Sequence, residues 1–322
     1  MNDRENATTQ CCAECGEEGG VSLKTCKACM HARYCSAECQ RNHWPKHKKQ
    51  CKLRAAELRD EALFKDPPPK EDCPICFLPM PINLINCMTL PPATISSVPI
   101  YDFALAHEEL ANETTEKCYP CCGKSICTGC LHSFRESGNA SKCPFCNSDR
   151  SSKTLEESVE QLMKRVGAND AGAMFAMGNQ YHNGRTSLIQ DHAKAMEFYT
   201  RAAELGFSMA SNNLGMLYHE GGNMKKAKFH FEAAAMAGHE AARYNLGNLE
   251  YNSGNIERAI KHWTIAASAG SYNAMHEMRG FFEKGPVSRE SIDSTLIAYN
   301  SSCNEMRSES RDAYIRVKTK ST

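Results

Sequence analysis

Cysteine is the residue type with the clearest chemical potential in this sequence. The chain has 19 cysteines in 322 residues: eight between Cys11 and Cys51, ten between Cys73 and Cys146, and then only Cys303. The opening MNDRENATTQ lacks the apolar core of a signal peptide, which favours an intracellular, reducing compartment, the cytoplasm or the nucleus. There, clustered thiols serve as metal ligands rather than as disulfides. We therefore expect two metal-binding modules before a cysteine-poor half.

The first cluster has the spacing of zinc ligands. Cysteines separated by two residues let a tight turn direct both sulfurs at one tetrahedral ion. His47 lies four residues before Cys51, on the same face of a helix, whereas His43, a competing imidazole, lies two turns from Cys51. A segment of about 40 residues buries too little apolar surface to fold unaided, so the metal must supply folding free energy. The expected ligands are Cys12, Cys15, Cys26, Cys29, Cys35, Cys39, His47 and Cys51.

Residues 12–51 resemble the MYND zinc finger. The family's last four ligand positions occur in the segments YCSAEC (34–39) and HKKQC (47–51). The resemblance implies two interleaved zinc ions, one on Cys12, Cys15, Cys35 and Cys39 and the other on Cys26, Cys29, His47 and Cys51. It also implies a module that binds short, often proline-containing peptides of other proteins. Cys11 is then surplus, and residues 1–11 are expected to be disordered.

Residues 52–72 are expected to link the two cysteine modules. The segment 52–64 has a helical pattern, and DPPPK (66–70) is an extended polyproline stretch that we interpret as a spacer. Six basic and no acidic residues lie between Arg41 and Arg54. Lys+Arg and Asp+Glu both total 38, so the net charge is zero, and a solvated helical face is a better interpretation than nucleic-acid binding.

The second cluster, residues 73–146, contains three further cysteine pairs of the same spacing. They are Cys73 and Cys76, Cys127 and Cys130, and Cys143 and Cys146. These pairs resemble a RING domain, in which the first and third pairs share one zinc ion and the second and fourth share another. The resemblance implies a first site of Cys73, Cys76, Cys127 and Cys130.

The second RING-like site departs from the family pattern. Lys124 occupies the position of a ligating histidine, and an ammonium group cannot bind zinc. We expect Cys121, Cys122, Cys143 and Cys146 as ligands, with Cys118 as the substitute. The insertion 77–117 is long for this family and is expected to fold back as a small element of its own, with Cys87 a buried thiol.

The RING resemblance implies a ubiquitin ligase, which works without a nucleophile by holding a charged ubiquitin-conjugating enzyme in a reactive pose. Ile75 and Pro144 correspond to the family's contact positions for that enzyme, but Asn147 stands where many active members have arginine. The sequence also fits a non-catalytic adaptor that only assembles protein complexes. A metal-dependent hydrolase is disfavoured because four protein ligands leave no open position for water.

A helix and a repeat array are expected after the zinc modules. Residues 147–167 form a connecting helix with a capping box at TLEE (154–157). Beyond it, a 32-residue period links three helix starts, three helix ends and three large core positions. They are Asp191, Asn223 and Asn255; Gly206, Gly238 and Gly270; and Tyr199, Phe231 and Trp263. Each of these helices follows a shorter one that contains Gly178, Gly215 or Gly247, which predicts close helix contact.

This pattern resembles the Sel1-like repeat, a relative of the tetratricopeptide repeat, within residues 168–306. We expect units at 170–206, 207–238 and 239–270, a degenerate fourth unit at 271–306, and a capping tail at 307–322. Asn213 and Asn245 are candidates to face a partner in the groove, and the lone histidines His182, His219 and His262 are expected at the surface.

The expected architecture is therefore two small zinc-stabilised modules followed by an all-α solenoid. It implies about four zinc ions per chain. The expected partners are proteins or peptides at the finger and the repeat groove, and a ubiquitin-conjugating enzyme at the RING-like module. No segment approaches the length of apolar sequence that a membrane helix needs, so no membrane contact is expected.

Overall fold

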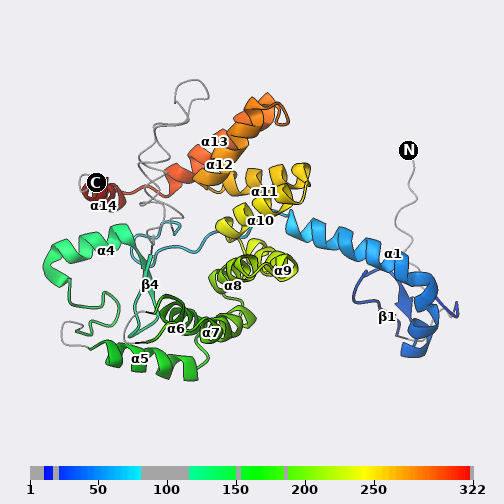
Figure 1. The fold of residues 1–322 in the computed structure, drawn as a ribbon, viewed down its shortest axis with the longest axis horizontal. Helices are drawn as coiled ribbons and strands as arrows, with labels where there is room; N and C mark the ends of the chain where they lie inside the picture. The colour runs from blue at the N-terminus through cyan, green and yellow to red at the C-terminus, as the bar shows by residue number, and fades with distance from the viewer. Residues whose placement is uncertain (1–10, 17–21, 81–115, 150–153, 185–187, 320–322) are drawn as a thin grey trace. The chain divides into compact units, whose positions relative to one another are not determined.

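Two compact units divide the chain, Met1–Lys65 and Asp66–Thr322. The computed structural model describes residues 11–16, 22–80, 116–149, 154–184 and 188–319 (Figure 1). Most of the expected N-terminal tail and of the insertion 77–117, Cys87 included, lies outside the described residues.

The first unit consists of a small hairpin and one long helix. Strands β1 (Lys24–Thr25) and β2 (Arg33–Tyr34) pair antiparallel, and α1 spans Ala37–Leu63. The Ser36 hydroxyl accepts a hydrogen bond from the Cys39 amide and so caps the helix N-terminus. The helix expected at 52–64 is therefore the second half of a longer helix that begins at the metal ligands and continues through Pro45.

The second unit begins with a cysteine-rich module of little regular structure. Strands β3 (Glu116–Cys118) and β4 (Ser125–Cys127) pair antiparallel, and α4 (Thr128–Phe134) follows, continued by the π-helical turn η1 (Arg135–Asn139). Among the described residues of this module, few apolar side chains other than cysteines are buried. Local metal coordination must therefore replace a hydrophobic core here.

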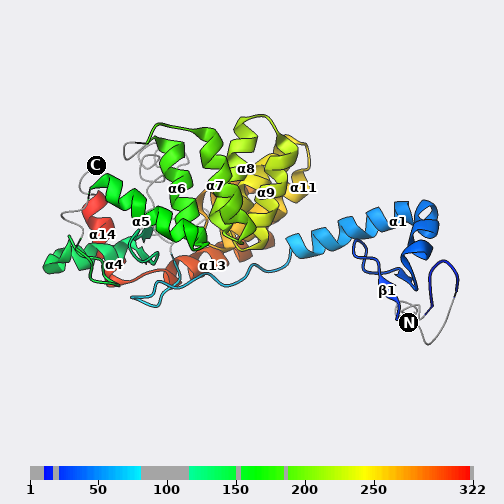
Figure 2. The ribbon, with the colours of Figure 1, turned by 90° about the horizontal axis from the view of Figure 1, so that it is seen from below.

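A capped helix and four helical hairpins follow. Helix α5 (Leu155–Gly167) begins with the expected capping box, in which Thr154 and Glu157 exchange two hydrogen bonds of 3.0 and 3.2 Å. The hairpins are α6 (Ala171–Asn183) with α7 (His192–Glu204), α8 (Ser208–Glu220) with α9 (Met224–Met236), α10 (Glu240–Asn252) with α11 (Ile256–Ser268), and α12 (Tyr272–Glu283) with α13 (Arg289–Glu305). Neighbouring hairpins pack side by side as a solenoid (Figure 2). The three expected helix-ending glycines all have positive φ, between 85° and 94°.

Glycines let the two helices of each hairpin approach closely. A methyl group at Gly178 would lie 2.5 Å from the Tyr199 ring, and one at Gly215 would lie 2.5 Å from the Phe231 ring. The third hairpin repeats the contact, with 2.3 Å between such a methyl group at Gly247 and the Trp263 indole nitrogen. The expectation of close helix packing at these glycines is confirmed.

The residue after each glycine matches the chemistry of the aromatic ring. The Tyr199 hydroxyl donates to the Asn179 amide oxygen at 2.7 Å, and the Trp263 indole N–H donates to the Asn248 amide oxygen at 3.1 Å. The second hairpin has Phe231, which has no polar atom, and Met216 stands at the equivalent position. An asparagine acceptor is thus present only where the aromatic ring carries a hydrogen-bond donor.

The structure bears on two expectations about polar residues in the repeats. Asn213 and Asn245 bond across the repeats, their side-chain amides lying 3.4 Å from the Asn179 oxygen and 3.3 Å from the Asn212 oxygen, and both stay partly exposed, so their contact with a partner stays a prediction. His262 is fully buried in α11 instead of lying at the surface. Burial, followed by the charge of Arg243, lowers the pKa of His262 to about 3, so the ring is neutral at pH 7.

A carboxylate also lies in the interior of the third hairpin. The Glu250 side chain, 1% exposed, contacts Lys228 at 2.6 Å and Arg258 at 3.2 Å, and accepts from the Asn255 amide at 2.7 Å. Burial raises its pKa, but these hydrogen bonds hold the pKa of Glu250 below its usual value. Asn255 begins α11 as expected, yet its side chain makes this bond instead of a cap.

The C-terminal tail forms a helix that packs on the cysteine-rich module. Helix α14 (Glu309–Thr319) contacts α4 along its length. At the crossing, a methyl group on Gly129 would lie 2.7 Å from the Arg311 Cα atom, so only glycine fits there. The tail therefore joins the far end of the solenoid to the cysteine-rich module within this unit.

The glycine contacts predict opposite effects for two alanine substitutions. Gly215→Ala should lower the free energy of unfolding by about 1–3 kcal/mol, because the added methyl group overlaps the Phe231 ring. Gly280 in α12 is the matched control: its Cβ position is open, so Gly280→Ala should raise stability by about 0.5–1 kcal/mol through helix propensity. Urea denaturation followed by circular dichroism measures both. Equal effects would contradict the tight contact.

Candidate metal centres

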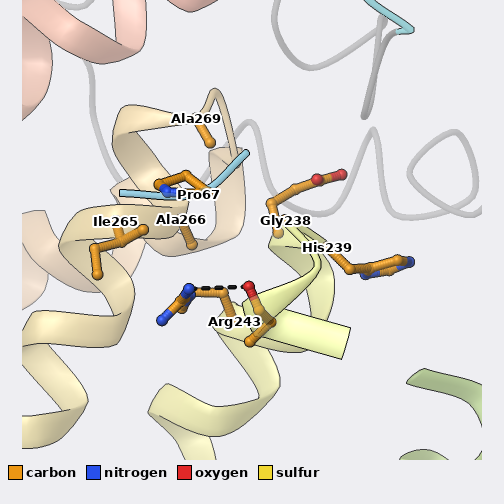
Figure 3. A pocket seen from close by; sticks show the side chains of 9 residues that line it. Pro67, Gly238, His239, Arg243, Ile265, Ala266 and Ala269 are labelled. Atoms are coloured by element: carbon orange, nitrogen blue, oxygen red, sulfur yellow. Dashed lines mark hydrogen bonds between the residues drawn. The ribbon is translucent and has the colours of Figure 1, made fainter. Parts of the chain in front are cut away.

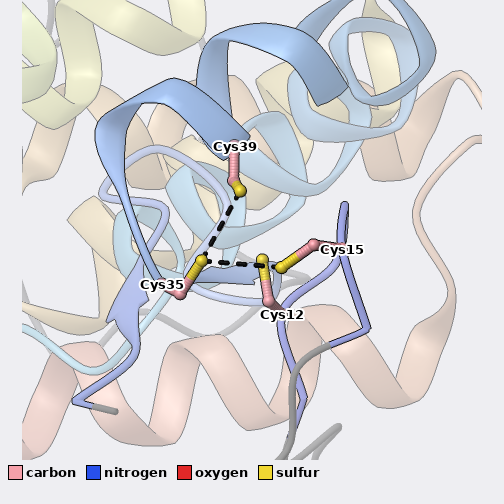
Figure 4. A group of neighbouring side chains, drawn as sticks. All are labelled: Cys12, Cys15, Cys35 and Cys39. Atoms are coloured by element: carbon pink, nitrogen blue, oxygen red, sulfur yellow. Dashed lines mark hydrogen bonds between the residues drawn. The ribbon is translucent and has the colours of Figure 1, made fainter.

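The first cluster in the finger gathers four sulfur atoms from three local elements. Cys12 and Cys15 come from the first turn, Cys35 follows β2, and Cys39 lies in the first turn of α1 (Figure 4). The Cys35 sulfur lies 3.6 Å from that of Cys15 and 3.5 Å from that of Cys39. Four ligands at about 2.3 Å from a tetrahedral zinc ion lie about 3.8 Å apart. The cluster therefore has the dimensions of a zinc site.

The second cluster combines three sulfurs and one imidazole. Cys26, Cys29, His47 and Cys51 lie within 4.8 Å of one another, with the His47 Nε2 atom 3.4 Å from the Cys29 sulfur. The other imidazole, His43, lies outside the cluster: its Nδ1 atom is 2.9 Å from the hydroxyl of the buried Tyr34, and its ring stacks on that of His47. His43 thus supports the ligating histidine rather than replacing it.

The third cluster consists of Cys73, Cys76, Cys127 and Cys130. The Cys76 and Cys127 sulfurs are 3.9 Å apart, and three of the four side chains are buried. The fully buried Arg311 of α14 extends to this cluster: its Nη2 atom lies 3.4 Å from the Cys76 sulfur, and its Nη1 atom donates to the Met306 carbonyl at 2.6 Å. Because four thiolates on one Zn²⁺ carry a net charge of about −2, a zinc ion here gives the buried guanidinium a negative partner.

The fourth cluster is Cys121, Cys122, Cys143 and Cys146, the set expected at the sequence level. The Cys122 sulfur lies 3.6 Å from that of Cys143, and the Cys146 sulfur lies 3.5 Å from that of Cys121. Of Cys118, the alternative ligand, only the backbone is described, in β3 opposite Ser125. Lys124 lies instead over the Phe145 ring, 5.5 Å from its centroid.

Backbone hydrogen bonds explain why the fourth cluster uses adjacent cysteines. The turns Cys73–Cys76 and Cys143–Cys146, here called zinc knuckles, share two backbone hydrogen bonds. The amide of the first cysteine donates to the carbonyl five residues later, and the carbonyl of the same cysteine accepts from the amide four residues later. Tyr119 makes the same two bonds, to Lys124 and from Gly123. Tyr119 therefore occupies a first-ligand position without a ligating side chain, and Cys121, within the same turn, supplies the missing sulfur. No residue spacing in the sequence marks this role of Tyr119, because it depends on backbone hydrogen bonds.

The crowded thiols need a cation to ionise together. Hydrogen bonds to the sulfurs of Cys39 and then Cys15 raise the pKa of Cys35 to about 12, and burial raises the pKa of Cys130. A zinc ion removes this cost because it binds thiolates and compensates their charge. The donor chemistry and the distances thus fit zinc in all four clusters, consistent with about four ions per chain. Each cluster offers four ligands, which suits structural rather than catalytic zinc.

The two candidate contacts for a conjugating enzyme differ in exposure. Ile75, between the cysteines of the first knuckle, is 41% exposed, and the neighbouring Phe77 is 76% exposed. Pro144 is only partly exposed. The first knuckle therefore presents apolar surface that nothing in the described part of this unit covers fully.

Zinc content tests the ligand set of the fourth cluster. The purified chain should contain about four zinc ions by elemental analysis, and Cys121→Ser should remove about one of them. Cys118→Ser is the matched control and should leave the zinc content unchanged. A loss with Cys118→Ser alone would assign Cys118 as the ligand, and fewer than three ions in the unsubstituted chain would contradict two modules with two ions each.

Because Arg311 contacts Cys76, removal of its guanidinium should speed metal release from the third cluster. Arg311→Leu should accelerate the loss of about one zinc ion per chain to a colorimetric chelator by about 10-fold or more, because the thiolates lose a positive hydrogen-bond donor. Arg307→Leu, which removes a half-exposed arginine of the same segment, should have no effect. The same release curve for both variants would contradict the coupling.

Comparison with known proteins identifies three repeats and a finger. A MYND finger model matches residues 12–51, a Sel1 repeat model matches residues 171–207 and 241–271, and a tetratricopeptide repeat model matches residues 210–237. The matched repeats lie in the part of the chain where the repeat array is expected. These matched models do not include a RING finger.

Similarity to individual proteins is local. Human histone-lysine N-methyltransferase SMYD3 is 50% identical over 34 residues, which are 11% of this chain and only 8% of that protein. A Sel1 repeat protein from Oxalobacter formigenes is 24% identical, with 56% of this chain and 72% of that chain covered and a TM-score of 0.43. The protective antigen c5321 from uropathogenic Escherichia coli, which displays an SLR fold, is 20% identical, with 58% and 43% covered and a TM-score of 0.40.

Hydropathy adds one finding. Among the described residues, no helix combines the length and the apolar character that crossing a membrane requires.

From the matched models, the chain contains a MYND finger followed by Sel1 and tetratricopeptide repeats.

Proposed function

We propose that this protein is a zinc-dependent protein-interaction scaffold whose second cysteine module acts as a RING-type ubiquitin ligase. MYND fingers and Sel1 or tetratricopeptide repeats are protein-interaction modules, and they flank the second module in sequence. In this proposal the finger and the repeats bind substrates, and the second module binds a ubiquitin-conjugating enzyme. Its zinc ions are structural, and transfer depends on positioning.

One observation supports the ligase most. The ligands of the second module alternate along the chain: the first and third groups form one cluster, and the second and fourth form the other. This is the ligand order of a crossed brace. It places the exposed Ile75 on a knuckle whose backbone is held by two ligands and by the Cys73–Phe77 hydrogen bond of 2.8 Å. A rigid apolar knuckle of this kind suits a weak, transient enzyme contact.

A second candidate, an adaptor without transferase activity, has its own support. Helix α14 covers one face of α4, so that face is closed to a partner in this conformation. In addition, Asn147 has a φ of 54° and stands directly after the last ligand, where many active RING domains have arginine. The adaptor uses the same zinc sites only to hold the module's fold.

Ubiquitin discharge distinguishes the two candidates. The purified chain should accelerate the release of ubiquitin from at least one member of a panel of charged conjugating enzymes, and Ile75→Ala should reduce that acceleration by about 10-fold, since the residue is an exposed contact. Met224→Ala, which alters an apolar residue of similar exposure on α9, is the matched control. No acceleration across the panel, with about four zinc ions bound, would exclude the ligase and leave the adaptor.

A further inference from the structure

The segment Pro67–Lys70, here called the proline strap, lies on the solenoid of its own unit instead of serving as a free spacer. A methyl group on Gly238 would lie 3.1 Å from the Pro68 Cγ atom. The Lys70 ammonium group donates to the Ala269 carbonyl at 2.7 Å and lies 3.4 Å from the Ser302 hydroxyl. These contacts join residues about 170–230 positions apart in the chain, and no pattern in the strap itself predicts them.

The surface below the strap, here called the strap seat, is built from the ends of three helices. Small residues at the ends of α9 and α11 let an extended chain approach. Ser302 comes from α13, and Met306 directly after α13 places its sulfur 3.7 Å from the Lys70 ammonium. The Ala269 carbonyl is at the C-terminal end of α11, where the helix dipole favours a cation. The seat therefore combines a shallow apolar track with a defined ammonium site.

A shallow recess of about 10 Å³, with room for no more than a single water molecule, lies beside Pro67. Pro67, Ala235, His239, Arg243 and Ile265 line it (Figure 3). Pro67, Pro68 and Pro69 are all exposed, so the strap covers the seat without being buried in it. The seat therefore holds the strap by surface contacts and by the lysine site rather than by deep burial.

We propose that the strap seat binds proline-rich segments of partner proteins that carry a lysine two residues after a pair of prolines. The strap competes with such segments for the seat within the chain. A polyproline segment suits such a site because its extended conformation is already formed and little entropy is lost on binding. The lysine supplies the specificity, since its ammonium group meets a carbonyl, a hydroxyl and a sulfur in one place.

The strap's attachment explains how a shallow contact stays formed. A short tether gives an intramolecular ligand an effective concentration in the millimolar range, so a weak site is mostly occupied. If the strap is seated nine-tenths of the time, it lowers the affinity for an external segment about tenfold. This inference concerns a third binding surface and does not depend on ubiquitin transfer.

The test uses the full-length chain and a fluorescent peptide of the strap sequence, DPPPKED. A strap variant, Pro67→Ser with Pro68→Ser and Lys70→Ser, frees the seat without changing the solenoid. The labelled peptide should bind this variant at least about tenfold more tightly than the unsubstituted chain in fluorescence anisotropy. The same peptide with glutamate in place of lysine should not bind.

Two further substitutions locate the binding. Ser302→Arg, added to the strap variant, places a cation where the lysine sits and should abolish binding. Ser301→Arg is the matched control: the neighbouring residue is exposed and its hydroxyl bonds to Glu305, so the peptide should still bind. Circular dichroism checks that all variants keep their helices.

Three outcomes would overturn the proposal. They are equal peptide affinity for the strap variant and the unsubstituted chain, binding that survives Ser302→Arg, and a dimer of the unsubstituted chain that the strap variant loses. The last result, by analytical ultracentrifugation, would mean that the seat takes the strap of a second copy.

Discussion

Tetrahedral coordination by thiolates is the interaction on which both cysteine modules depend. The finger is too short to bury a sizeable core, and among the described residues the apolar interior of both modules consists largely of the cysteines themselves. In both modules the ligand groups alternate along the chain between two clusters. Each ion therefore joins two segments between which a ligand group of the other ion lies in the sequence. Loss of one ion therefore loosens the loops that hold the other. This interleaving makes a small module cooperative without a hydrophobic core.

In the second unit, charge links the metal to the rest of the fold. Arg311 comes from the last helix of the chain and is fully buried beside Cys76. A buried guanidinium is costly without a negative partner, and a four-thiolate zinc site provides one. Docking of α14 and metal binding are thus mutually favourable. The cysteine-rich module and the solenoid form one unit, to which α14 and α5 both contribute contacts.

The solenoid shows how a repeat tolerates variation. Its three aromatic residues differ, yet each packs closely against a glycine of the preceding helix. The residue after the glycine changes with the ring, asparagine for the hydroxyl and the indole and methionine for phenylalanine. The close glycine–aromatic contact is therefore constant along the three repeats, while the aromatic residue and the residue after the glycine change as a pair. The same constancy leaves helix ends, such as the strap seat, free to differ between repeats.

The sequence alone determined the features that depend on local spacing. Pairs of cysteines two residues apart, the four-residue step from His47 to Cys51, the capping box at Thr154 and the 32-residue period predict the finger, its zinc and the repeats, because turns and helices are local structures. Only the tertiary structure decided the contacts between distant segments, namely the docking of α14 and the seating of the proline strap, together with the burial of His262 and the first-ligand backbone position of Tyr119. Each of these features depends on which surfaces contact each other after folding. The charge, burial and shape of such contacts leave no periodic pattern in the sequence.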